Sequence, residues 1–119
     1  SDVEQTMNWT MEFANGAVCE ACASYSQGAN RFRAESAGGN WVEFKSNAFM
    51  YTGVSAETSR GPLRPVTANQ QARQMDDFAA CVREGRESPV SGEMGLRDMK
   101  IIAAIYESAA SGKRTLVKI

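Results

Sequence analysis

The sequence predicts an α+β domain: an open antiparallel β-sheet with two C-terminal helices packed on one of its faces. Apolar and polar residues alternate along several short segments before residue 50, which is the period of half-buried strands. From residue 70 onward, apolar residues recur at helical spacing in two longer segments. Most strands therefore precede the helices instead of alternating with them, an order typical of α+β and not of parallel α/β folds.

The first two predicted strands form a hairpin around Asn15-Gly16. This dipeptide is favoured where two successive residues have positive φ, so we predict a two-residue type I′ turn. Thr10 then faces Ala21, and the hairpin has one apolar face and one flat face of small residues. The flat face is expected to hold Thr6, Asn8, Thr10, Cys19, Ala21, Ala23 and Tyr25.

A second hairpin is predicted at the Gly38-Gly39 turn. Residues 50–68 contain glycines and prolines with little periodicity, and are predicted to form a loop with one short edge strand near 54–58. The closing "TLVKI" is predicted to add a last strand to the sheet. On the apolar side of the second hairpin we expect Phe32, Ala34, Val42 and Phe44.

Two amphipathic helices are predicted at the C-terminal end. The first begins at Gln70 and ends before Gly85, a residue suited to the left-handed position that closes a helix. The second has Ser91 as N-cap, Glu93 in its first turn and Gly112 at its end. The stripe expected to face inward comprises Leu96, Met99, Ile102, Ala103, Tyr106 and Ala110, widened by Ile101 and Ile105.

Length and composition limit the function classes. The chain of 119 residues fits a single domain, 1–119. Thirteen basic and fourteen acidic residues are interspersed, which argues against a nucleic-acid partner, and no apolar run is long enough to span a membrane. The absence of histidine removes the most common general acid/base. No residue is predicted to be catalytic, and Asp76, Asp77 and Glu84 are interpreted as a solvated helix face.

Cys19 and Cys22 have the spacing of a CxxC metal or redox motif. Residues three apart on a strand point to opposite faces, so we predict two separate buried thiols and no metal site. Cys81 is interpreted in the same way. Three unpaired thiols and the lack of a visible leader favour a reducing, cytoplasmic location.

Four stretches of the segment 69–119 are typical of one protein family: "NQ", "QMDDFA", "SGEMGLRDMKIIAAIYESAASGK" and the closing "TLVKI". With "FANGAVCEACASYS" and "GGNWVEF" upstream, it resembles the C-terminal domain of the glucose-fructose oxidoreductase (Gfo/Idh/MocA) family, which includes inositol and sugar dehydrogenases. The resemblance implies that the full enzyme acts on a sugar-like substrate. It also implies an N-terminal dinucleotide-binding domain that binds NAD or NADP. The family's Glu-Lys-Pro motif is absent here, so we expect a fragment, inactive alone, whose hydride-transfer residues precede Ser1.

Within this chain, the resemblance implies a substrate-shaping and oligomerisation role. Tyr51, Asn69 and Gln70 bracket the passage from sheet to helix and are the expected substrate-lining residues. The small-residue face suggests self-association of two sheets, and the residues expected at that interface are Thr6, Thr10, Ala21 and Tyr25. The alternative hypothesis is a non-enzymatic module that dimerises or binds a small ligand.

Overall fold

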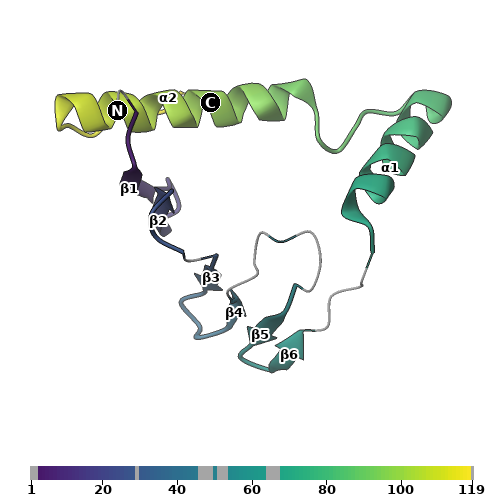
Figure 1. The fold of residues 1–119 in the computed structure, drawn as a ribbon, viewed down its shortest axis with the longest axis horizontal. Coiled ribbons are helices and arrows are strands. Elements are labelled where there is room, and N and C mark those ends of the chain that lie inside the picture. The colour runs from purple at the N-terminus through teal and green to yellow at the C-terminus, as the bar shows by residue number, and fades with distance from the viewer. Residues whose placement is uncertain (1–2, 29, 46–49, 51–53, 64–67, 119) are drawn as a thin grey trace. The chain divides into compact units, whose positions relative to one another are not determined.

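The computed structural model describes residues 3–28, 30–45, 50, 54–63 and 68–118. Within these ranges, six strands precede two helices (Figure 1), which confirms the α+β class. All the described strand pairs are antiparallel, but they form two separate sheets, with orders β1-β2 and β3-β4-β5-β6. The chain divides into the units Ser1–Met75 and Asp76–Ile119, and the packing of the helices on one sheet face stays a prediction.

The element bounds are β1 Thr6–Glu12, β2 Val18–Ser24, β3 Phe32–Glu35, β4 Trp41–Phe44, β5 Ala56–Thr58, β6 Gly61–Leu63, α1 Gln70–Glu84 and α2 Gly92–Ser111. Within the described ranges, neither helix combines the length and the apolar character needed to cross a bilayer. The buried hydrophobic residues of the described part are Ala56 and Cys81.

The turn of the first hairpin is one residue longer than predicted, so the predicted turn type was wrong. Gly16 N donates to Phe13 O at 2.9 Å, and Phe13 N donates to Ala17 O at 2.9 Å, which closes a three-residue loop. Gly16 has φ 84°, whereas Asn15 is not among the residues with positive φ. This is the pattern of a type I turn followed by a left-handed glycine. The Asn15 Oδ1 instead accepts a hydrogen bond from Ala17 N at 3.1 Å.

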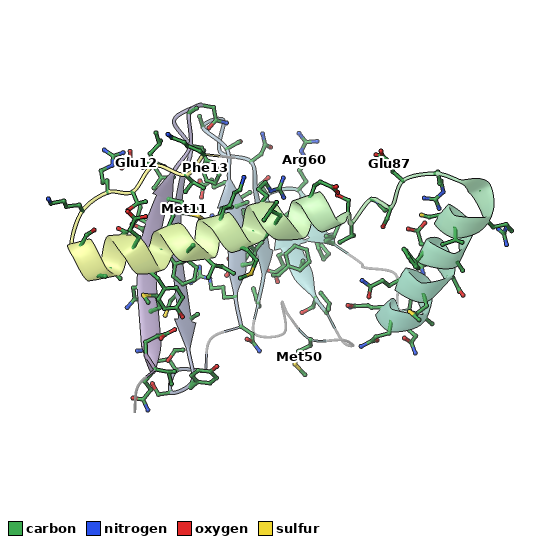
Figure 2. The ribbon with its side chains drawn as sticks, turned by 90° about the horizontal axis from the view of Figure 1, so that it is seen from above. Met11, Glu12, Phe13, Met50, Arg60 and Glu87 are labelled. Carbon is green, nitrogen blue, oxygen red and sulfur yellow. The ribbon has the colours of Figure 1, made fainter. Side chains whose placement is uncertain are left out.

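The longer loop changes the register, so Thr10 faces Glu20 and Trp9 faces Ala21. A slip of one residue transfers every side chain of a strand to the other face. The half-buried face therefore holds Met7, Trp9, Met11, Cys19 and Ala21, with Ala23 at its end. The opposite face, here called the polar face, holds Thr6, Asn8, Thr10, Glu12, Val18, Glu20, Cys22 and Ser24. Figure 2 shows Met11, Glu12 and Phe13 at the turn end of this hairpin.

The second hairpin has the predicted faces. Phe32 lies opposite Phe44, and Ala34 lies opposite Val42. The rings of Phe32 and Phe44 meet edge to face with centroids 6.1 Å apart, a favourable aromatic geometry. The connection is another three-residue loop, in which Ser36 N donates to Asn40 O at 2.8 Å and Gly39 has φ 75°.

The predicted short strand near 54–58 is present as β5, but it lies inside the sheet and not at its edge. The edge is β6, which was predicted to be loop because it contains Gly61 and Pro62. Proline lacks an N–H and is tolerated on an edge strand. The turn between β5 and β6 is closed by Thr58, whose Oγ1 donates to Gly61 O at 2.9 Å and accepts from Arg60 N at 3.1 Å. Arg60 extends from this turn (Figure 2).

Helix α2 has the predicted ends. Ser91 Oγ accepts a hydrogen bond from Met94 N at 3.4 Å, and Gly112 has φ 65° with its N–H bonded to Ser108 O at 2.9 Å. Helix α1 ends at Glu84, and Gly85 has φ 65°, as predicted. The bond from Arg86 N to Cys81 O at 3.1 Å is that of a Schellman motif.

The apolar stripes predicted to face inward are largely exposed. In α2, Leu96 and Met99 are 60% and 61% exposed, while Ile101 and Ile105 are half-buried together with Ala104 and Ser108. In α1 the residues Met75, Phe78 and Val82 are likewise exposed. Apolar side chains extend around more than half of the circumference of α2, so periodicity alone does not select one side.

The predicted C-terminal strand is absent from the described residues 115–118. Thr115 and Val117 are half-buried, while Leu116 is 83% exposed, so the side chains alternate as on a strand. A strand also needs a hydrogen-bonded neighbour, and these residues are assigned to no strand pair. These described residues thus form no strand, while the pairing of the segment with the sheet, which belongs to the other unit, stays a prediction.

We expect Gly16→Ala to destabilise the first hairpin by about 1–2 kcal/mol, because an L-residue is unfavourable at positive φ. A Cβ at this position meets no atom within 4 Å, so the cost is conformational and not a clash. Gly95→Ala is the matched control. A Cβ at Gly95 also meets no atom within 4 Å, but this residue lies within α2, where alanine is favoured. Urea unfolding measures both. Equal stability of Gly16→Ala and the parent would contradict the observed turn.

Ser91→Ala is expected to lower the stability of α2 by about 1 kcal/mol, because the cap bond to Met94 N is lost. Ser91→Asp should retain most of the stability, since aspartate is also a good N-cap. Far-ultraviolet circular dichroism during urea unfolding compares the three proteins. A loss of the same size in the aspartate variant would show that the capping bond is not the cause.

Glu93 in the first turn of α2 should make the helix pH-dependent. Hydrogen bonds from its own backbone N–H and from Ser91 lower the pKa of Glu93 below its usual value. A lowered folded-state pKa adds stability that is present above the unfolded-state pKa, and this stability is lost as the pH falls through the folded-state pKa. Helix content followed from neutral to acidic pH should therefore fall less steeply in Glu93→Gln. Identical curves would contradict the role of Glu93.

Candidate functional site

The three residues predicted to line a substrate differ in what the structure shows. Tyr51 lies outside the described residues. Asn69 precedes α1, where its Oδ1 accepts a hydrogen bond from Ala72 N at 3.0 Å and its carbonyl oxygen accepts one from Arg73 N at 3.1 Å. Gln70 is the exposed first residue of α1. Asn69 is thus the N-cap of α1, a role that explains an asparagine at this position.

The four residues predicted at a self-association interface do not share one face. Thr6 and Thr10 lie on the polar face of the hairpin, and Ala21 lies on the half-buried face with Trp9. Tyr25 N donates to Gln5 O at 3.0 Å, which continues the register and places Tyr25 on the side of Ala21. Tyr25 is nevertheless 92% exposed, beyond the end of β2. The register slip therefore separates Thr6 and Thr10 from the other two residues.

At the open end of the polar face, hydroxyl groups form a hydrogen-bonded cluster. Thr6 Oγ1 and Ser24 Oγ are 2.7 Å apart, and Ser24 Oγ lies 3.2 Å from Ser26 Oγ. Ser24 Oγ also accepts from the backbone N–H groups of Ser26 and Gln27, each at 3.1 Å. Further along the face, Asn8, Thr10 and Cys22 are exposed. The polar face therefore carries mostly short side chains, and its acidic residues, Glu12 and Glu20, lie toward the turn.

The cysteines of the CxxC sequence diverge as predicted. Cys19 faces Met11 on the half-buried side, whereas Cys22 faces Asn8 on the polar side. Cys22 is exposed, so the prediction that both thiols are buried was wrong for this residue. In the described part of the chain, no group of three or more potential ligands could hold a metal ion. The spacing alone could not reveal exposure, because burial depends on which face the register assigns.

Cys81 is buried, as predicted, within the C-terminal turn of α1. Its Sγ lies 3.7 Å from Glu87 O and 4.0 Å from Asp77 Oδ2. Arg86 binds Asp77 Oδ1 at 2.7 Å and Glu84 Oε2 at 3.0 Å. Asp77 and Glu84 are therefore partners of Arg86, and not simply a solvated face. Their hydrogen bonds raise the pKa of Arg86, which fixes its positive charge at the helix end.

Sequence reasoning missed a charged network on one face of the four-stranded sheet. Glu43, at the centre, accepts Arg31 Nε at 3.1 Å and Arg33 Nη1 at 3.1 Å. Arg33 Nη2 also binds Glu35 at 2.8 Å, and its guanidinium lies 4.7 Å from the ring centroid of Trp41. Arg31 and Arg33 alternate with Phe32 along the sequence, but their pairing with Glu43 depends on the cross-strand register of β3 and β4.

Arg33 of this network and Lys45 keep their positive charges at neutral pH. Hydrogen bonding to Glu35, supported by Glu43, raises the pKa of Arg33, and hydrogen bonding to Glu57 at 2.9 Å raises the pKa of Lys45. Groups whose pKa is raised in this way stay protonated, so Arg33 and Lys45 cannot act as general bases. The network can orient the strands or meet a polar surface, and it supplies no proton-accepting chemistry through these two residues.

The chain matches a protein-family model and no solved structure. The absent structural match means that the fold is described from this chain alone. The family model described as the oxidoreductase family, C-terminal alpha/beta domain, matches residues 1–119, which is the full length of the chain. The antiparallel strands followed by two helices agree with the fold that the sequence resemblance implied. The chain therefore belongs to the Gfo/Idh/MocA oxidoreductase family, as its C-terminal domain.

Proposed function

We propose that this chain is the substrate-side and subunit-contact domain of an NAD(P)-dependent oxidoreductase that acts on a sugar or a cyclitol. The family match over residues 1–119 is the observation that carries this proposal. In the complete enzyme, hydride would pass between the nicotinamide and a carbon that bears a hydroxyl group. The hydride-transfer residues would lie in a dinucleotide-binding domain upstream of Ser1.

The described residues do not themselves fit a dinucleotide. Such cofactors bind where a parallel strand–helix–strand unit presents a glycine-rich turn to the pyrophosphate. Strand pairing among the described residues is antiparallel, and each described hairpin turn leads directly into another strand. Hydride transfer is therefore proposed for the upstream domain, and the shaping of the substrate side for this chain.

The substrate-side role is proposed for the start of α1. Asn69 uses Oδ1 to cap the helix, so it would offer a substrate its Nδ2 donors. Gln70 is exposed beside it and has both donor and acceptor groups. Hydrogen-bonding groups of this kind suit the hydroxyls of a sugar or cyclitol. Tyr51 stays part of the proposal on the basis of sequence alone.

Subunit contact is proposed for the polar face of the β1–β2 hairpin. Its central residues Thr10 and Cys22 are exposed and short, which permits the close approach of a second sheet at about 10 Å. Thr6 lies on the same face, whereas Ala21 and Tyr25 lie on the other. Of the four residues predicted at the interface, the proposed contact therefore includes Thr6 and Thr10.

The cofactor assignment is tested with NADH, followed by its fluorescence. We expect residues 1–119 alone to leave NADH fluorescence unchanged, because the described strands lack a dinucleotide-binding unit. The longer reading frame, extended upstream by about 200 residues, should bind NADH, since that length accommodates one further domain and its connection. Binding of NADH by residues 1–119 alone would contradict the proposed division of labour. An upstream region without a dinucleotide-binding domain would favour the non-enzymatic module.

The contact surface is tested by Thr10→Arg in the longer protein. A long, charged side chain at the centre of the polar face should prevent close approach and lower the mass measured by sedimentation equilibrium. Ala14→Arg is the matched control, because it adds the same charge at the exposed hairpin turn, away from both faces. An unchanged mass for Thr10→Arg, with NADH binding intact, would reject this surface without affecting the oxidoreductase assignment.

A further inference from the structure

We draw no further inference here: the strongest candidate, the exposed apolar face of α2 formed by Leu96, Met99, Ile102 and Tyr106, carries nothing because nothing in the structure shows what covers it.

Discussion

The left-handed backbone at Gly16 sets the register on which the first hairpin depends. Because this residue closes a three-residue loop with Phe13 and Ala17, each position on β1 faces the β2 residue one place nearer the turn than a two-residue loop would give. Side chains on a strand alternate between faces, so the loop length also decides which cysteine is exposed. The composition of both faces, and with it the proposed subunit contact, follows from the conformation of one glycine.

The remaining elements are fixed largely by bonds at their ends and across their strands. Asn69 and Ser91 satisfy backbone N–H groups at the starts of the two helices, while Gly85 and Gly112 close them. In the four-stranded sheet, Glu43 joins two arginines of the neighbouring strand segment. Exposed ion pairs of this kind contribute little stability singly, and their main effect is to favour one register over its alternatives.

The accuracy of the sequence predictions follows the range of the interactions involved. The bounds of α2 depend on Ser91 and Gly112, whose chemistry is local, and both were predicted. The turn type was not, since Asn-Gly suits a type I′ turn and also a type I turn with a left-handed glycine. The edge strand β6 was also not predicted, because Gly61 and Pro62 are more typical of a loop. In the C-terminal segment, side-chain alternation suggested a strand, but alternation does not reveal whether a pairing partner is present.

The candidate site was predictable only in part, for a related reason. The divergence of Cys19 and Cys22 follows from strand geometry alone, whereas the exposure of Cys22 required the register. Asn69 could have been recognised as a cap, because an asparagine directly before a helical segment is the usual signal. The bonds from Glu43 to Arg31 and Arg33 span two strands, so local sequence patterns do not contain them.

Pro62 has a consequence for how the four-stranded sheet meets other chains. It occupies the middle of β6, the outermost of the described strands on that side, and it has no N–H to offer an incoming backbone. A strip of only three residues with a proline at its centre is a poor template for strand addition, which protects against edge-to-edge aggregation. Among the described strands, β3 is the other edge of this sheet, and it contains no proline.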